Sequence, residues 1–281
     1  MTMMTVEKDP LGRCVDLYYE DIGYGQPVVF VHGWPFDHGM WENQRFALVN
    51  SGYRVITYDQ RGFGLSSKPA NGYHYDKLTD DLRTLLDFLD LNDVVLVGFS
   101  MGAAEIVHYM SRNFGQRIRQ VVLISSVTPK FPDIDYLKTG AQDLIKSAPP
   151  DRDEMMRSIA QRIFAGPASS PANEMVMEWA TGLLDFLASP IALSDTASAM
   201  RETDLTNAMK SIKHVPTLLV HGTQDRVAPF QANAVQSSKM LPDCSFKPYE
   251  DAPHGLFATH AERLNMDLLA FIKTPPMTVL P

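Results

Sequence analysis

A serine at the junction of a strand and a helix narrows the folds open to this chain more than any other feature. The apolar run Val94–Val97 leads into Gly98-Phe99-Ser100-Met101-Gly102, and a helical pattern over residues 103–110 follows directly. Such a tight turn strains the serine backbone, and glycine two positions to either side leaves room for the strand and the helix. We therefore predict that Ser100 is presented, not buried, on a nucleophile elbow; a serine in an ordinary turn is the structural alternative.

Short apolar, β-branched runs alternate with helical patterns along much of the chain. Leucines from Leu78 to Leu89 recur at the three- and four-residue spacing of one buried helical stripe. The candidate strands are 14–20, 27–31, 53–58, 93–97, 120–125, 217–220 and 245–249, with a weaker one at 5–8. This alternation predicts an α/β fold with a mostly parallel, doubly wound sheet of eight strands.

The alternation stops between Thr128 and Lys213. This stretch has helical patterns and several prolines but no convincing strand. We interpret residues 128–213 as an inserted helical cap, which divides the α/β core into a first part, 1–127, and a second part, 214–281.

Composition limits the partners of the chain. Its 281 residues are 45% apolar, enough for a sizeable core, and its net charge of -8 comes without a basic block. We therefore expect a small-molecule substrate and neither nucleic acid nor a membrane, and leave a homo-oligomer open. Two distant cysteines imply neither a disulfide framework nor a zinc site, and the absence of an apolar leader or span favours a cytoplasmic protein.

A nucleophilic serine needs a base that follows it in the chain. Catalytic loops gather at the carboxyl ends of parallel strands, in the order serine, acid, histidine. His254 lies on a loop after the last strand and is the predicted base. The alternatives are His221, which is still on its strand, and His260, which falls inside the expected final helix; we predict that both are structural.

The acid should follow the strand before that histidine. Asp225 does so, and a buried carboxylate there would hold the imidazole in the tautomer that accepts the serine proton. The alternative is a solvated turn aspartate. Some hydrolases take the acid from the preceding strand, but here Ser126 and Val127 follow that strand and offer none.

Two backbone amides are expected to hold the oxyanion. One belongs to Met101, directly after the nucleophile. The other is assigned to Trp34, because Pro35 has no N–H and restricts its neighbour. The Trp34 indole should wall the acyl pocket, while His32 should bond the loop rather than act as a second base.

The cap is expected to select the substrate. It is rich in methionine and aromatic side chains, of which we assign Met177, Trp179 and Phe186 to substrate binding. Methionine adapts to varied apolar shapes, which favours a lipophilic acyl or aryl group. Ordinary helix packing is the alternative for each of these side chains.

The motifs of both core segments resemble the α/β-hydrolase superfamily, and within it the cofactor-free bacterial haloperoxidases, perhydrolases and aryl esterases. They are His32-Gly33-Trp34-Pro35, Asp59-Gln60-Arg61-Gly62-Phe63-Gly64-Leu65-Ser66, Gly98-Phe99-Ser100-Met101-Gly102, His221-Gly222-Thr223-Gln224-Asp225 and Asp251-Ala252-Pro253-His254-Gly255-Leu256-Phe257. One departure is that Ala103 and Ala104 stand where that branch has two more glycines. We assign a structural role to the second motif, in which Asp59 and Arg61 can satisfy each other or nearby carbonyls.

These residues predict a serine hydrolase that cleaves small aryl or alkyl esters, and lactones among them, through an acyl-enzyme without metal or cofactor. The resemblance implies that hydrogen peroxide can replace water and yield a peracid. Amides and C–C bonds are alternative substrates of the same triad, and a slowly hydrolysing small-molecule receptor is a different class. Relatives that attack with aspartate are disfavoured, because position 100 is serine.

Overall fold

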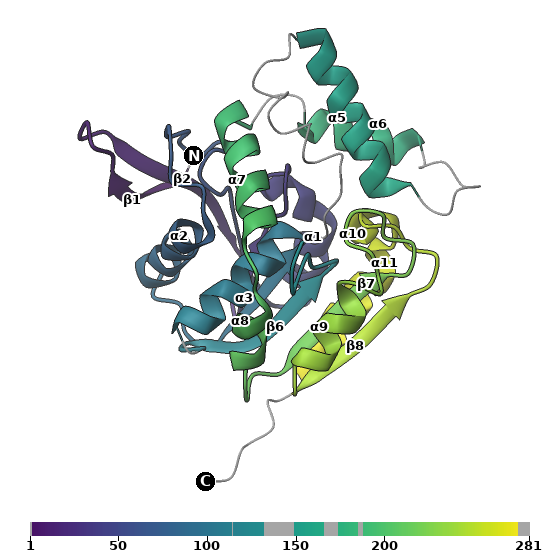
Figure 1. Ribbon diagram of the computed structural model, residues 1–281. Coiled ribbons are helices and arrows are strands. Elements are labelled where there is room, and N and C mark those ends of the chain that lie inside the picture. Colours follow the sequence, from purple (N-terminus) through teal and green to yellow (C-terminus); the bar gives the residue numbers. More distant parts are fainter. Residues whose placement is uncertain (1, 114, 132–148, 166–173, 185–187, 275–281) are drawn as a thin grey trace.

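The computed structural model describes residues 2–113, 115–131, 149–165, 174–184 and 188–274 (Figure 1). Its centre is an 8-stranded sheet in the order β1-β2-β4-β3-β5-β6-β7-β8. The strands are β1 (Met3–Lys8), β2 (Cys14–Ile22), β3 (Pro27–Val31), β4 (Arg54–Tyr58), β5 (Val94–Phe99), β6 (Ile118–Ile124), β7 (Thr217–Gly222) and β8 (Cys244–Tyr249). Only the β1–β2 and β2–β4 pairs are antiparallel, so the predicted fold is confirmed.

Helices cover both faces of the sheet. Every residue of β5 and β7 is buried, as expected of central strands with helices on each side. Helix α2 (Tyr75–Phe88) packs beside α3 (Met101–Asn113), and α1 (Glu42–Val49) packs beside α11 (Ala261–Lys273). The predicted leucine stripe of α2 is buried against the core from Leu78 to Leu86.

The described chain between β6 and β7 is helical. It contains α5 (Pro149–Phe164), α6 (Glu174–Leu184), α7 (Pro190–Glu202) and α8 (Thr206–Ser211), together with one isolated bridge between Lys130 and Asp204. Helices α5 and α6 pack on each other, whereas α8 packs beside α3 of the core (Figure 1). The cap boundaries at 128 and 213 stay a prediction.

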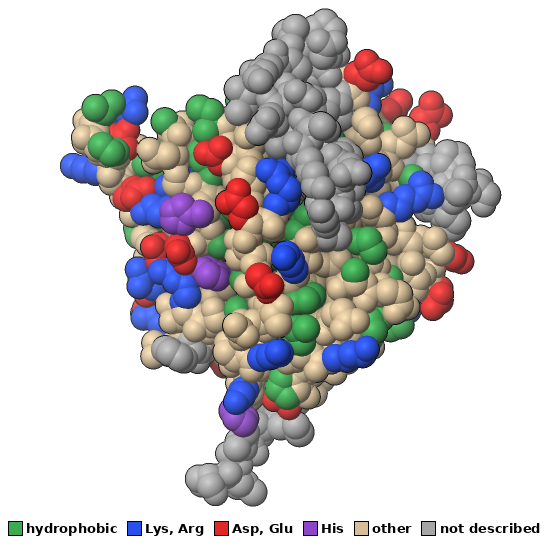
Figure 2. Space-filling view, viewed as in Figure 1, with side chains coloured by type: hydrophobic (Ala, Val, Ile, Leu, Met, Phe, Trp, Pro, Cys, Tyr) green, Lys and Arg blue, Asp and Glu red, His purple; other side chains and the backbone are tan. Residues whose placement is uncertain are grey.

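The remaining helices are short and follow β3, β7 and β8. They are η1 (His38–Trp41), α9 (Ala234–Met240) and α10 (Leu256–Thr259). On the face drawn in Figure 2, acidic and basic side chains are interspersed. Among the described helices, none combines the length and the apolar character that a bilayer crossing requires.

The carboxyl group of Glu105, on the helix that follows the elbow, is buried in the core. Glu105 lies on α3 and is completely buried, and its Oε1 accepts a hydrogen bond of 3.0 Å from the hydroxyl of Tyr58. Burial raises the pKa of Glu105 to about 8, and the nearby Asp81 adds to the rise, although the bond from Tyr58 opposes it. The side chain is therefore mainly a neutral acid at pH 7.

We expect this burial to make stability depend on pH. The pKa of Glu105 is raised on folding, so its contribution is fully present below the ordinary value of 4.5 and is lost as pH rises toward about 8. Within that window, the free energy of unfolding should fall by up to about 1.4 kcal/mol per pH unit. Glu105→Gln removes the titration, so urea unfolding between pH 5 and 8 should show a smaller loss of stability for the variant.

Glu262→Gln serves as the control, because Glu262 is an exposed glutamate on α11. It should follow the wild type at every pH. A Glu105→Gln variant whose unfolding free energy also runs parallel to that of the wild type would contradict the proposed burial of a neutral carboxyl.

Candidate active site

The turn between β5 and α3 holds Ser100 in a strained conformation. Its φ of 51° lies in the left-handed region, which residues other than glycine rarely adopt. A β-carbon built at Gly98 would lie 2.7 Å from the amide nitrogen of Ala103, and one at Gly102 would lie 2.5 Å from the carbonyl oxygen of His32. The two flanking glycines are therefore required by close approach, as the sequence analysis predicts.

Ser100 is nevertheless buried. Only 3% of the residue is exposed, so the prediction of a presented serine is wrong in this respect. The reason is tertiary: the ring of His254 lies against the serine, with Nε2 2.9 Å from Oγ. The elbow turns the hydroxyl toward the base and not toward open solvent.

The structure brings the three predicted triad residues together. The Nδ1 of His254 lies 2.7 Å from Oδ2 of Asp225, and Nε2 of the same ring faces Ser100. A carboxylate only accepts, so Nδ1–H donates to Asp225 and leaves the lone pair of Nε2 to accept the serine proton. Asp225 follows β7 and His254 follows β8, as predicted from the order of the motifs.

Asp225 is a buried carboxylate with several hydrogen-bond donors. Its Oδ1 accepts from the amides of Val227, at 2.8 Å, and Ala228, at 2.7 Å. Burial alone would raise the pKa of Asp225, but the charge of His254 and hydrogen bonds from His221 and His254 outweigh burial and hold it well below its usual range. Asp225 therefore stays ionised beside His254.

The two predicted oxyanion donors lie on elements that pack directly against each other. Gly33 leaves room for the loop after β3 to contact Phe99, since a β-carbon there would lie 2.9 Å from the Phe99 carbonyl oxygen. Within the described residues, the amides of Trp34 and Met101 have no hydrogen-bond acceptor. Two unpaired N–H groups beside a nucleophile are what an oxyanion site requires.

Trp34 and His32 flank this loop in different roles. The indole Nε1 of Trp34 donates to the Leu193 carbonyl on α7 at 3.1 Å, which ties the loop to the cap. Nε2 of His32 accepts from the amide of Gln60 at 3.0 Å, and Nδ1 lies 3.1 Å from the Gly33 carbonyl. Burial lowers the pKa of His32 to about 4, although Asp59 opposes the fall, so this ring is neutral and structural as predicted.

The expectation that Asp59 and Arg61 satisfy each other or nearby carbonyls is wrong. Asp59 accepts from Nδ1 of His38 at 2.7 Å, whereas Arg61 makes two bonds to Asp81, of 2.6 and 2.7 Å. A further bond of 2.8 Å links Arg61 to Glu7. Both residues thus find partners on other elements, Asp59 on η1 and Arg61 on α2.

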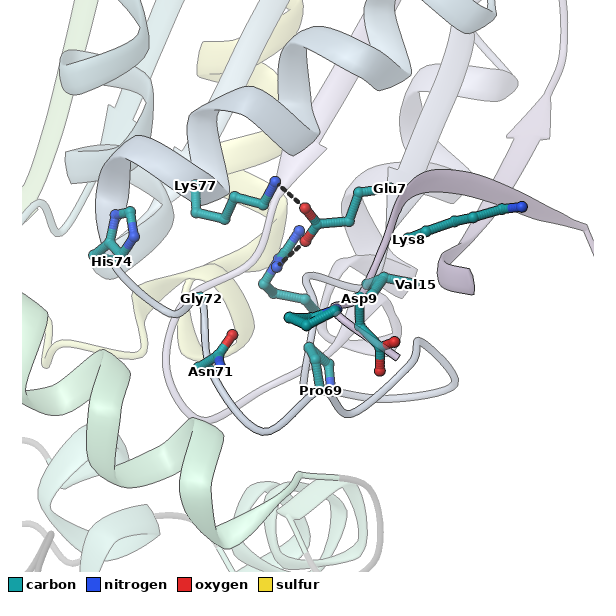
Figure 3. A pocket seen from close by; sticks show the side chains of 11 residues that line it. Glu7, Lys8, Asp9, Val15, Pro69, Asn71, Gly72, His74 and Lys77 are labelled. Atoms are coloured by element: carbon teal, nitrogen blue, oxygen red, sulfur yellow. Dashed lines mark hydrogen bonds and ion pairs between the residues drawn. The ribbon is translucent and has the colours of Figure 1, made fainter. Parts of the chain in front are cut away.

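A cavity of about 590 Å³ lies beside Arg61 (Figure 3). Glu7 accepts from both Arg61 and Lys77 at its edge, so these three charges are paired with one another. None of the triad residues lines this cavity, and it forms no part of the candidate site.

Helix α5 of the predicted cap contacts the histidine loop directly. The Ile163 carbonyl accepts a hydrogen bond of 2.7 Å from the amide of Gly255, the residue after His254. Gly255 lacks a side chain where the ring of Phe164 lies, and Phe164 contacts Phe257 at a ring separation of 5.8 Å. Sequence alone does not place Phe164 at the site, because no motif surrounds it.

The predicted substrate-binding residues of the cap are placed in part. Trp179 is half-buried, with its ring 6.3 Å from that of Phe164 and 6.1 Å from that of Phe257. Met177 is half-buried and packs against the hydrophobic core. Phe186 lies outside the described residues. Together with Phe99, these rings form an aromatic wall beside the base, which consists of Trp179, Phe164, Phe257 and Phe99. The ring of Phe99 is 4.9 Å from that of His254.

Residues 26–261 match the alpha/beta hydrolase fold family, and the chain belongs to it. Within that family it is similar to non-heme chloroperoxidase CPO-A1 of Kitasatospora aureofaciens, with 34% identity over 92% of this chain and 96% of the relative. The bifunctional esterase/perhydrolase DCH of Acinetobacter calcoaceticus is 31% identical over 92% of this chain and 97% of its own. The bromoperoxidase from Bacillus anthracis superposes with a TM-score of 0.89 at 35% identity, covering 97% of this chain and 99% of that one. The predicted resemblance is confirmed.

The close approach at Gly102 leads to a test of the elbow. We expect Gly102→Ala to lower the free energy of unfolding by about 1 to 3 kcal/mol, because the new methyl group meets the carbonyls of Val31 and His32. Ester hydrolysis should fall as well, since the same contact sets the spacing of the oxyanion donors. Denaturant unfolding and steady-state kinetics measure the two effects.

Gly182→Ala is the matched control on α6, where a β-carbon meets nothing within 4 Å. Both substitutions gain helix propensity, and the control should be neutral or stabilising by up to about 1 kcal/mol. Equal unfolding midpoints for the two alanine variants would rule out the steric role of Gly102.

Proposed function

We propose that this chain is a serine hydrolase of small aryl and alkyl carboxylic esters, lactones included, that works through an acyl-enzyme on Ser100. The observation that carries the proposal is the hydrogen-bonded chain from Ser100 through His254 to Asp225, at a strained strand-to-helix turn. The family of the chain and its esterase/perhydrolase relative support the same reaction class.

The geometry suits acyl transfer step by step. Nε2 of His254 takes the hydroxyl proton of Ser100 as Oγ attacks the ester carbonyl, and Asp225 stabilises the imidazolium that forms. The amides of Trp34 and Met101 hold the oxyanion of the tetrahedral intermediate. His254 then protonates the leaving alcohol, and water, activated by the same ring, releases the carboxylic acid.

Hydrogen peroxide can take the place of that water. Its oxygen attacks the acyl carbon, the bond to Ser100 Oγ breaks, His254 returns the proton to the serine, and a peracid leaves. The peracid can oxidise a halide away from the site, becoming the carboxylic acid. The names of the chloroperoxidase and esterase/perhydrolase relatives support this second activity.

The aromatic wall over the histidine favours an apolar acyl or aryl group. Phe164 and Trp179 contribute to it from α5 and α6, and Phe99 and Phe257 from the core. Aromatic and apolar linings of this kind are typical of small-molecule pockets. A cytoplasmic location stays a prediction, and a homo-oligomer stays open.

The triad assignment predicts large losses of turnover. Ser100→Ala and His254→Ala should each lower kcat by several orders of magnitude, because triad members act as a unit. Asp225→Asn should lower kcat by up to about 10⁴, because it favours the wrong tautomer of His254. Release of p-nitrophenol from p-nitrophenyl acetate over many cycles gives kcat and separates an enzyme from a receptor that stops near one equivalent.

Asp251→Asn provides the control on the histidine loop, since Asp251 is exposed. It should keep wild-type turnover. Retention of more than about a tenth of the wild-type rate by Ser100→Ala would refute the nucleophile, against the loss expected for a triad serine.

We expect the cap to set chain-length preference. Trp179→Ala and Met177→Ala should enlarge the pocket and move the optimum of an ester series to longer acyl chains, each methylene being worth about 1 to 3 kcal/mol of discrimination. The measurement is kcat/KM for p-nitrophenyl esters of graded length.

Met175→Ala is the control on the same helix, because Met175 is 74% exposed. Its profile should match that of the wild type. If Trp34 variants shift the optimum while Trp179→Ala and Met177→Ala do not, the core loop and not the cap determines specificity.

A further inference from the structure

Asp225 has a second imidazole beside it. His221 is the penultimate residue of the buried strand β7, four residues before Asp225. Its Nε2 lies 3.1 Å from Oδ2 of Asp225 and 2.8 Å from the Ala228 carbonyl oxygen. Both of these oxygens only accept, so Nε2 must carry a hydrogen, which the two share. The side chain is fully buried.

The other ring nitrogen of His221 lies in a different environment. Its Nδ1 is buried and has no hydrogen-bond partner among the described residues. A hydrogen on Nδ1 would be buried without an acceptor, which is costly. His221 therefore acts on Asp225 as a hydrogen-bond donor through Nε2.

Two histidines thus donate to one carboxylate oxygen. Oδ2 accepts from Nδ1 of His254 at 2.7 Å and from His221, while Oδ1 is occupied by the amides of Val227 and Ala228. The carboxylate cannot rotate without breaking at least one of these bonds. Part of the negative charge on Oδ2 is balanced by His221 and is not available to His254.

We propose that His221 is a positioning residue that aims Asp225 at His254 and limits the basicity of His254. This role rests on the proposed hydrolase function. The titratable groups that bond Asp225 are His254, on the loop after β8, and His221, on β7. Ser100, at the start of α3, faces His254 from the other side.

Loss of the His221 donor should shift the acidic midpoint of the kcat/KM profile in a defined direction. Without His221, Oδ2 carries more charge, stabilises the imidazolium of His254 more strongly, and the base is protonated at higher pH. The acidic midpoint of the kcat/KM profile should therefore move upward. Turnover should also fall, because the carboxylate loses one of its orienting bonds.

The test compares His221→Leu with His221→Gln on p-nitrophenyl acetate, with rates normalised by titration of the active serine with a fluorophosphonate. His221→Leu has similar volume and no donor, and should lower kcat by about tenfold to a hundredfold, the usual effect of losing a hydrogen bond to a charged group. Its acidic midpoint should rise by about half a unit to one unit, with KM little changed. His221→Gln, whose amide nitrogen can replace Nε2, should recover most of both effects.

Val220→Ala is the control for destabilisation, because Val220 is buried on β7. It should lower stability and leave the midpoint unchanged. If His221→Leu fails to fold, His221→Asn, whose shorter amide does not reach Asp225, is the variant without a donor.

If the wild type is active and the acidic midpoint of the kcat/KM profile does not move in the variant without a donor, the role of His221 is overturned and the proposed function is not. A midpoint shift that His221→Gln shares in full, or that Val220→Ala reproduces, also overturns it. An inactive wild type, or a fully active Ser100→Ala, overturns the proposed function and this role with it.

Discussion

The close approach of α3 to the end of β3 is the contact on which the site depends. Gly102, in the first turn of α3, lies against the backbone carbonyls of Val31 and His32, with no space for a side chain. This contact places the nucleophile next to the loop that bears Trp34. The strained φ of Ser100 persists because the strand before it and the helix after it are both buried. The spacing of nucleophile and oxyanion donors is thus a property of core packing.

The acid and the base are held by a second set of contacts on the other side of Ser100. Ser125, at the end of β6, donates to the His254 carbonyl at 2.8 Å, and Gly222 of β7 lies against the Ala252 carbonyl of the histidine loop. A buried carboxylate is tolerated only with donors around it, and Asp225 has them from its own turn and from two histidines. The ends of three neighbouring strands therefore converge on one imidazole.

Helices α5 and α7, which lie within the predicted cap, take part in this arrangement. The Ile163 carbonyl holds the amide next to His254, and the Leu193 carbonyl holds the indole of Trp34. One cap helix is thus bonded to the loop of the base, and another to the loop of an oxyanion donor. Helices α5 and α7 therefore bond the same two loops that bear the predicted base and one predicted oxyanion donor.

Much of the fold and the triad could be predicted because their determinants are local. Strands are visible as β-branched apolar runs, and the topology of a parallel sheet dictates the order Ser100, Asp225, His254. The rest depends on distances between segments remote in sequence. The pairing of Arg61 with Asp81, the burial of Ser100 and the contact of Phe164 with Gly255 have no motif of their own.

His221 shows where local inference ends. A histidine on a buried apolar strand is most simply interpreted as packing, and its spacing from Asp225 in the sequence is the same whether or not the two side chains meet. They meet here because the chain turns back after Gly222, so that the Ala228 carbonyl and Oδ2 of Asp225 both come within reach of one Nε2. A three-centre hydrogen bond of this kind is a result of the turn geometry. The same residue type at the same spacing would be inert on a strand that continued straight.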